Sequence, residues 1–314
     1  MQALASESRM SSSIVIRAFD DADRAAAADL IAAEWPHRAD EAASLRDGDY
    51  LPSAHRWTAA DPTSGAVRAY ASLWRVVGDR FRMDLVVAPE WRRQGIGSRM
   101  METLLSAAAS DGAATLQARA YASAADALRF LERRGFAETM RMRGMRLDLG
   151  ALDVDRLAAY ERRAAEQGFA LTTLADAQRR DPECWRKLWA LYGAAQEGWA
   201  DPDPRPGPPQ PLSYEAFLSR IAEFPPDTRA FFIAVKDERY AGFTGSLGTV
   251  VHPELRGLGL ANALKARAAL HARAAGLETL ETSTGSAAMQ RANENVGYRL
   301  TCTEVRLVRR ITPE

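Results

Sequence analysis

An eleven-residue segment occurs twice in this chain, and the repeat narrows the possible folds more than any other feature. Residues 87–97 read VAPEWRRQGIG, and residues 251–261 read VHPELRGLGLA, an offset of 164 positions. A glycine followed by an aromatic residue recurs at 135–136 and at 297–298, an offset of 162 positions. Self-similarity at a fixed period marks one structural unit used more than once. We therefore predict that the chain is a tandem of one fold.

The length agrees with two domains. A chain of 314 residues exceeds what one hydrophobic core usually serves, because domains hold roughly 100–200 residues. We expect four parts in this order: a disordered polar tail at 1–13, an N-terminal domain at 14–149, a helical connector at 150–167 and a C-terminal domain at 168–314.

The spacing of apolar residues indicates which segments of the first half are strands and which are helices. Gly78 and Asp79, between two strand-like runs, are typical of a hairpin turn, and Ser123 stands where a helix N-cap is expected. The pattern predicts strands at 14–19, 54–60, 66–77, 81–88, 115–121 and 137–148, and helices at 21–37, 40–46, 95–109 and 123–134. This order predicts an α/β fold of the α+β type with a mixed sheet.

The second half repeats this order with two differences. The segment 201–211 holds six prolines, which excludes a helix or a central strand there. The segment 241–251 must hold a strand, a turn and another strand in little space. Trp185 and Trp189 lie four residues apart on the preceding helix. They either pack in the core or form one wall of an acceptor pocket, with 201–211 as its lid.

The composition excludes several classes of protein. The 41 basic residues are balanced by 41 acidic ones, and each half is itself neutral, so we expect no nucleic-acid partner. Cys184 and Cys302 lie far apart, which supports neither a disulfide framework nor a metal site. No apolar stretch approaches the roughly 18 residues of a membrane span. We therefore expect a cytoplasmic protein with no bound metal and no membrane partner.

The repeated segment predicts an anion-binding loop in each half. In both copies the glycines follow an apolar strand and open a helix. A helix start presents free backbone N–H groups and the positive end of the helix dipole, and glycine lets an anion approach that backbone closely. The loop at 92–97 does not match the Rossmann GxGxxG, whose first glycine would stand at Arg92, and no Gly-Lys-Ser/Thr follows as in a Walker loop.

The pattern R-x-x-G-x-G/A after V-x-P, followed by G-F/Y after a second helix, resembles the GNAT N-acetyltransferase superfamily. The resemblance covers nearly the whole chain, twice, and implies two tandem GNAT-like domains, each a mostly antiparallel central sheet flanked by helices. It also implies that acetyl-CoA is the acyl donor, with its pyrophosphate on the loop and its pantetheine between two strands that splay apart at a bulge. The residues expected to bind it are Val87, Arg92, Arg93, Gln94, Gly95, Ile96 and Gly97 in the first half, and Val251, Arg256, Gly257, Leu258, Gly259, Leu260, Ala261 and Asn293 in the second.

The C-terminal half resembles one branch of this family in more detail. That branch carries T-x-V-x-P, A-L-K and a series of spaced asparagines before G-F, and this half matches it at Thr249, Ala263-Leu-Lys265, Met289, Asn293 and Gly297. Thr282 and Ser286 stand where the first two asparagines are expected. The support for a cofactor site is therefore weaker in this half than in the first.

Acetyl transfer to an amine needs a base for the ammonium proton and, preferably, an acid for the departing thiolate. Asp84, on the strand before the loop, is one candidate for the base; it could instead face solvent or pair with Arg82 or Arg68. Many family members carry a tyrosine acid four residues before the G-F pair, but Leu131 and Asn293 stand there. Tyr121 is the candidate replacement unless it packs as an ordinary strand aromatic. Glu34, His37 and His252 are further candidate bases, although each could be a surface residue.

The resemblance implies an N-acetyltransferase that moves an acetyl group from acetyl-CoA to a primary amine of a small molecule or peptide by direct attack. The chemistry is better supported in the N-terminal half. The alternative is a CoA-binding sensor or scaffold in which one or both domains are inactive, which the missing tyrosines allow. The chain is expected to be either a monomer whose tandem domains form a pseudo-dimer or a homodimer.

Overall fold

The computed structural model describes residues 14–48, 54–196, 212–223 and 225–311. It divides the chain into two compact units, Met1–Met140 with Glu304–Glu314 and Arg141–Thr303. The tail at 1–13 and the proline-rich segment at 201–211 lie outside the described residues, so the predictions made for them stay predictions.

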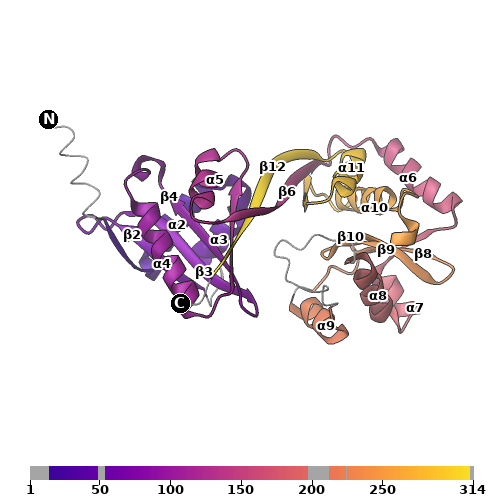
Figure 1. Ribbon diagram of the computed structural model, residues 1–314. Helices are drawn as coiled ribbons and strands as arrows, with labels where there is room; N and C mark the ends of the chain where they lie inside the picture. Colours follow the sequence, from indigo (N-terminus) through magenta and orange to yellow (C-terminus); the bar gives the residue numbers. More distant parts are fainter. Residues whose placement is uncertain (1–13, 49–53, 197–211, 224, 312–314) are drawn as a thin grey trace. The chain divides into compact units, whose positions relative to one another are not determined.

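The first unit is a mixed sheet between two layers of helices (Figure 1). Its strands β1 (Val15–Ala18), β2 (His55–Ala60), β3 (Val67–Val77) and β4 (Arg80–Val87) pair antiparallel with their neighbours, and β5 (Thr115–Tyr121) then pairs parallel with β4. The helices are η1 (Asp21–Asp23), α2 (Arg24–Glu34), η2 (Pro36–Arg38), α3 (Ala39–Asp47), η3 (Pro89–Trp91), α4 (Ile96–Ser110) and α5 (Ala125–Glu132). This confirms the predicted fold class.

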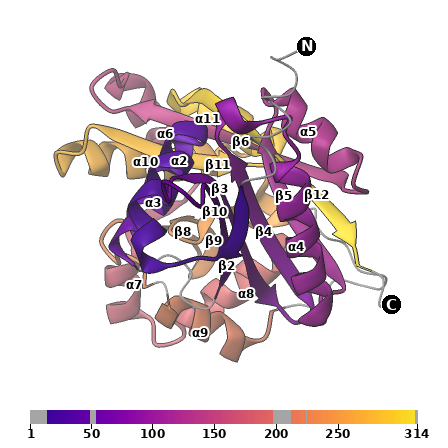
Figure 2. The ribbon, with the colours of Figure 1, turned by 90° about the vertical axis from the view of Figure 1, so that its left-hand side faces the viewer.

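Side-chain alternation along the strands buries both faces of this sheet. Leu73, Phe81 and Leu116 pack against α4 on one face. Tyr70 and Val86 pack against α2 and α3 on the other. Figure 2 shows these two helix pairs on opposite sides of the strands. The sheet therefore separates an α4/α5 face from an α2/α3 face.

The last strand of each half pairs with a strand of the other half. In β12 (Arg299–Arg310), residues Glu304–Arg310 pair antiparallel with β5. In β6 (Ala137–Asp148), residues Arg143–Asp148 pair with β11 (Thr279–Thr284). The compact units therefore divide within β6 and β12, unlike the ranges 14–149 and 168–314 expected from the repeat. Local periodicity predicts that a strand forms but does not identify its partner, and Leu307 is buried in the first core while Leu147 is buried in the second.

The second unit holds the sheet β10-β9-β8-β7 together with the β6–β11 pair. Its further elements are α6 (Val154–Glu166), β7 (Ala170–Thr173), α7 (Leu174–Arg180), α8 (Cys184–Gln196), α9 (Tyr214–Glu223), β8 (Phe232–Lys236), β9 (Arg239–Gly245), β10 (Gly248–Val251), η4 (Pro253–Leu255), α10 (Leu260–Ala274) and α11 (Ala287–Val296). A two-residue turn at 246–247 joins β9 to β10, and Gly248, the first residue of β10, follows it with φ +91°.

Helix α6 belongs to the second unit as well as connecting the halves. Glu161 accepts a hydrogen bond from Nε of Arg267 on α10 at 2.8 Å, and Ala164 is buried against the same helix. Trp185 and Trp189 pack against Phe217 and Tyr214 of α9, which favours a core role for the tryptophan pair.

The start of α5 differs from the prediction. The prediction of Ser123 as an N-cap is wrong, because α5 begins at Ala125 with Ala124 as its N-cap and no side chain capping it. Within the described ranges, no helix has the length and apolar character needed to cross a membrane.

Candidate functional site

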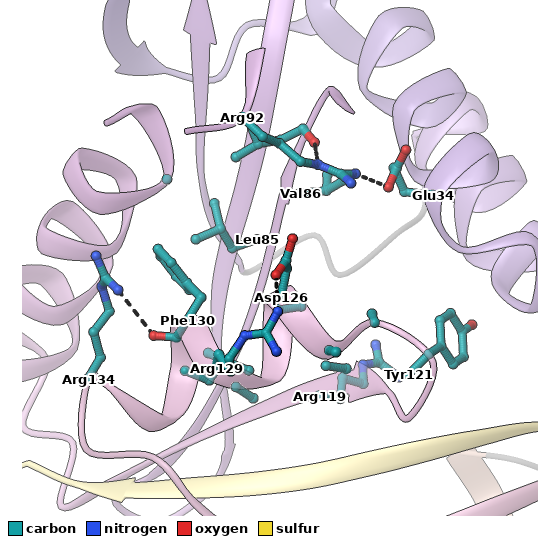
Figure 3. A pocket seen from close by; sticks show the side chains of 18 of the residues that line it. Glu34, Leu85, Val86, Arg92, Arg119, Tyr121, Asp126, Arg129, Phe130 and Arg134 are labelled. Carbon is teal, nitrogen blue, oxygen red and sulfur yellow. Dashed lines mark hydrogen bonds and ion pairs between the residues drawn. The ribbon is translucent and has the colours of Figure 1, made fainter. Parts of the chain in front are cut away.

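The first unit contains a cleft where β4 and β5 separate. The two strands pair only from Arg80–Thr115 to Arg82–Gln117, and their next residues diverge. A cavity of about 1060 Å³ lies there, with Met83, Leu85 and Val87 of β4 and Ala118 and Ala120 of β5 among its lining residues (Figure 3). In the described chain, the β5-facing edge of β4 beyond Arg82 has no strand partner. This edge can therefore hydrogen-bond to an extended ligand, as an added strand would.

The cavity passes from one face of the sheet to the other. Leu85 and Ala118 belong to the α4/α5 face, whereas Val86, Arg119 and Tyr121 belong to the α2/α3 face, and all five line the same cavity. A ligand bound on one side can therefore present its end to a second molecule on the other side.

The predicted anion loop opens into this cavity. Gly95 is the N-cap of α4 with φ +83°, Arg93 has φ +61°, and no side chain caps the helix start. Helix starts leave backbone N–H groups without intrahelical partners and attract anions. Arg92, Arg93, Gly95 and Gly97 all line the cavity. The local geometry thus fits the pyrophosphate of an acyl-CoA.

The side chains of the loop tie it to neighbouring elements. Nε of Arg92 donates to the Val87 carbonyl at 3.0 Å, and its guanidinium pairs with Glu34 at the end of α2 (Figure 3). Arg93 lies 3.5 Å from the Asp126 carboxylate, and Gln94 donates to the Glu90 carbonyl at 3.2 Å. Arg92 and Arg93 remain 46% and 78% exposed, so both can turn toward a phosphate.

Asp84 is an ion-paired carboxylate in the interior. It is 3% exposed, with Nη2 of Arg38 at 2.6 Å and Nε of Arg119 at 3.3 Å. Burial raises the pKa of Asp84, but the Arg119 and Arg38 guanidiniums outweigh burial and lower the pKa to about 2. The geometry therefore opposes Asp84 as a general base near neutral pH. Its partners also differ from the expected Arg82 and Arg68.

The expected bulge near Val87 is absent from the pairing of β4 with β3. The register runs unbroken from Leu73–Met83 to Ala69–Val87. Asp84 and Val87 therefore point to opposite faces, and the cleft opens by divergence from β5 alone.

Asp84 belongs to a cluster that joins five elements, η2, α3, β4, β5 and β12. Glu41 of α3 accepts hydrogen bonds from both Arg38 and Arg119, and Glu304 of β12 lies 3.8 Å from Arg119. Arg38 also covers the ring of Trp35, with its guanidinium carbon 4.3 Å from the ring centroid. Because Arg119 and Trp35 both line the cavity, this cluster holds its α2/α3 wall in place.

Tyr121 lies at the end of β5, where the cavity reaches the α2/α3 face. The rings of Tyr121 and His37 meet edge to face with centroids 5.7 Å apart. Glu34 lines the cavity as well. The structure thus brings together Glu34, Tyr121 and the loop, and places His37 against Tyr121.

The second unit repeats the loop conformation. Gly259 is the N-cap of α10 with φ +81°, Gly257 has φ +84°, and no side chain caps this helix either. The described part of the sheet joins β10 to β9 only, so β10 and β11 do not pair. Leu258 is 41% exposed, and Arg256 donates to the Ala195 carbonyl at 3.5 Å.

The polar residues expected around this second loop lie elsewhere. Asn293 is fully buried, and its Nδ2 contacts Sδ of Met145 at 3.3 Å while Oδ1 has no hydrogen-bond partner among the described residues. Ser286 caps α11 by accepting from the Met289 amide. His252 lies 3.9 Å from Glu254 at the surface. Asn293 therefore sits inside the unit, which opposes the predicted ligand contact.

Lys265 of α10 is a buried ammonium that faces the ring of Tyr298 at 5.4 Å. It is 6% exposed, no described carboxylate pairs with it, and burial lowers its pKa to about 8. The folded state therefore disfavours the charged form, fully below pH 8 and less as pH rises toward 10.5.

We expect Lys265→Met to raise the free energy of unfolding by about 3 kcal/mol at pH 7, because it removes this charge and keeps the aliphatic stem. Urea denaturation at pH 7 and pH 10 measures the gain, which should shrink at the higher pH. Lys236→Met, at an exposed lysine, is the control and should give no gain. An equal or lower stability of Lys265→Met at pH 7 would contradict the assignment.

Sequence reasoning missed Arg38, Glu41 and Arg119. Arg119 carried a usable signal, because it is a charged residue within a strand whose neighbours are buried. Arg38 and Glu41 carried none, since a charged residue near a helix start is ordinary.

Comparisons with known proteins agree with this geometry. Residues 52–138 match the family model of the acetyltransferase (GNAT) domain. None of the curated proteins matches the chain. Among solved structures, a GCN5-related N-acetyltransferase from Sphaerobacter thermophilus has a TM-score of 0.71 at 20% identity, over 96% of each chain.

Two further structures resemble the chain over both units. A tandem GNAT protein from the clavulanic acid biosynthesis pathway has a TM-score of 0.65 at 20% identity, over 96% of this chain and 99% of that one. A glucosamine N-acetyltransferase region in a fungal multi-domain β-N-acetylglucosaminidase has a TM-score of 0.67 at 15% identity, over 94% of this chain and 38% of that one. At these identities the likeness concerns the fold.

Proposed function

We propose that the chain is a tandem, two-domain member of the GNAT superfamily and that it transfers an acetyl group from acetyl-CoA to a primary amine of a small molecule or peptide; the match of residues 52–138 to the GNAT domain model and the fold likeness to solved GNAT structures support this. One observation carries this proposal: a single cavity runs from an uncapped, glycine-containing helix start, between two splayed strands, to the opposite face of the sheet. Such a passage suits a donor on the α4/α5 side and an acceptor on the α2/α3 side.

The donor is held by the chain's own backbone and arginines. The backbone from Arg92 to Gly97 binds the pyrophosphate, with Arg92 and Arg93 adding charge. The free edge of β4 up to Val87 binds the pantetheine amides as a neighbouring strand would. A backbone N–H near Val87 stabilises the oxyanion of the reacting carbonyl.

The transfer itself is a direct displacement. The amine nitrogen attacks the thioester carbon, a C–N bond forms, and the C–S bond breaks to release a thiolate. Tyr121 donates a proton to the thiolate, and Glu34 accepts the surplus proton of the amine, directly or through water. Phosphate binding competes for Arg92, which frees the Glu34 carboxylate for this role. Asp84 remains ionised and positions Arg119.

The second unit is proposed as a further CoA-binding domain rather than the place of transfer. Its backbone from Arg256 to Ala261 repeats the loop conformation, with Val251 preceding it, which supports binding. Its polar candidates, Asn293 and Ser286, are engaged inside the unit, which leaves the acceptor chemistry to the first unit.

Calorimetry with acetyl-CoA, together with thiol release over a panel of amines, tests the proposal. We expect tight binding of acetyl-CoA and amine-dependent release of free CoA thiol. Binding without thiol release for every amine would favour the alternative of a CoA-binding sensor or scaffold. Absence of binding would overturn the proposed donor.

A further inference from the structure

Arginines and carboxylates alternate on the α2/α3 face of the first unit, just below the cleft. Asp84 and Glu41 are each shared by Arg38 and Arg119. On neighbouring β12, Glu304 is shared by Arg119 and Arg306, at 3.8 Å and 3.2 Å. Each of these three carboxylates therefore already has two guanidinium partners.

Arg82 lies on the same face, but its partners differ in kind from those of Arg38, Arg119 and Arg306. Nη2 of Arg82 donates a hydrogen bond to Oε1 of Gln117, a neutral acceptor, at 3.1 Å. Its guanidinium carbon lies 5.9 Å from the Trp74 ring centroid. No carboxylate in the described parts of the chain forms an ion pair with it. Arg82 is thus a partly buried cation without an ion-pair partner among the described residues.

Two neighbouring arginines make the positive charge of Arg82 still less favourable. Arg306 faces Arg119 across the β12–β5 register, and Arg119 stands two residues after Gln117, which faces Arg82. Burial, Arg119 and Arg306 all lower the pKa of Arg82, with Asp84 and Glu304 opposing them. A partly desolvated cation beside two others is unfavourable unless an anion joins it.

Arg82 lies where β4 and β5 begin to separate into the cleft. Arg82–Gln117 is the last backbone pair before β4 and β5 diverge, and the next residues, Met83 and Ala118, already line the cavity. Arg82 and Gln117 do not themselves line the cavity, so an anion at Arg82 would sit beside the closed end of the cleft, on the α2/α3 face proposed for the acceptor.

We propose that Arg82, Gln117 and Arg306 form a recognition site for an oxyanion group, carboxylate or phosphate, carried by the acceptor. That the anion belongs to the acceptor rests on the proposed function. The anion site itself rests on the geometry of these residues. Two arginines and an amide supply the fork of donors that carboxylates and phosphates take up in pairs. Four residues separate Arg82 from Val86, roughly 13 Å at about 3.3 Å per residue. The acceptor is therefore an extended molecule with its amine and its anionic group at opposite ends.

Thermal denaturation of the full chain tests the site without turnover. Succinate, succinamide and inorganic phosphate are the probes, at equal ionic strength. We expect succinate or phosphate, but not succinamide, to raise the melting temperature of the first unit by about 3 °C at ten times the dissociation constant. The relative size of the two shifts distinguishes carboxylate from phosphate. No shift with either anion would overturn the inference.

Arg82→Met removes the charge and keeps the stem that packs on Trp74. We expect it to weaken anion binding at least tenfold, since hydrogen bonds to charged groups are the strong ones. Arg306→Met provides a second variant in case the first fails to fold. Arg146→Met, at an exposed arginine paired with Glu281, removes the same charge elsewhere and should bind as the wild type does. Equal binding by Arg82→Met and Arg146→Met would overturn the inference.

Measurements of turnover test whether this anion site recognises the acceptor. We expect kcat/KM for 6-aminohexanoate or 5-aminopentylphosphonate to exceed that for 6-aminohexanamide at least tenfold, and Arg82→Met to remove the difference. Acetyl-CoA binding is measured in the same samples. Loss of that binding overturns the proposed function, whereas intact turnover with equal rates for all three amines overturns only this inference.

Discussion

Gly95→Val is expected to lower the affinity for acetyl-CoA by at least about 100-fold. Gly95 has φ +83°, which a β-branched residue adopts only with strain, so the loop must change conformation. The first-turn N–H groups of α4 then no longer converge on the pyrophosphate. Losing two charge-assisted hydrogen bonds at about 1.5 kcal/mol each accounts for this factor. Calorimetry measures the loss.

The chain offers matched controls for this experiment. Gly112, in the turn after α4, has φ +75° and, like Gly95, open space where a Cβ would stand, so Gly112→Val carries the same strain outside the loop. Gly259 and Gly276 form the corresponding pair around α10, at φ +81° and +82°. We expect Gly95→Val to abolish turnover and Gly259→Val to preserve it. The reverse result would place the transfer in the second unit.

Asp84→Asn is expected to destabilise the first unit by about 3 kcal/mol or more. The substitution keeps the shape of the side chain but leaves Arg38 and Arg119, both largely buried, with less compensating charge. Urea denaturation measures the loss. Asp126→Asn is the control, because Asp126 pairs with Arg129 at the surface and should leave the midpoint nearly unchanged. Equal midpoints for the two variants would contradict the structural role.

The stabilisation from Asp84 also depends on pH. Its pKa is lowered from 3.8 to about 2 in the folded chain, so the contribution is complete above about pH 4 and is lost as pH falls toward 2. The wild type should therefore lose more stability than Asp84→Asn over that interval. If Asp84 were instead the general base, Asp84→Asn would lose turnover while keeping the wild-type midpoint.

The conformation of the two glycine-containing helix starts could be predicted from the sequence because it depends on local residues. A glycine that permits positive φ, a following helix and a preceding strand all lie within a few residues of Gly95, and the structure confirms each of them. The predicted strand at 115–121 is likewise confirmed, since its alternation reflects burial on both faces.

Contacts between distant residues could not be predicted in this way. The state of Asp84 depends on Arg38, 46 residues before it, and on Arg119, 35 residues after it. Asn293 fits a family motif, yet its environment depends on Met145, which lies on a strand from the other half of the sequence. A local sequence pattern holds no information about contacts between residues so far apart in the chain.

The sequence by itself determined that one fold is used twice and where each copy places its glycine-containing helix start. Both follow from backbone geometry and periodicity over short segments. Only the tertiary structure decided which strands β6 and β12 pair with, that Asp84 is buried between two arginines, and that Arg82 forms no ion pair within the described residues. Strand pairing and the protonation of buried groups depend on neighbours brought together by folding, and a linear pattern does not contain them.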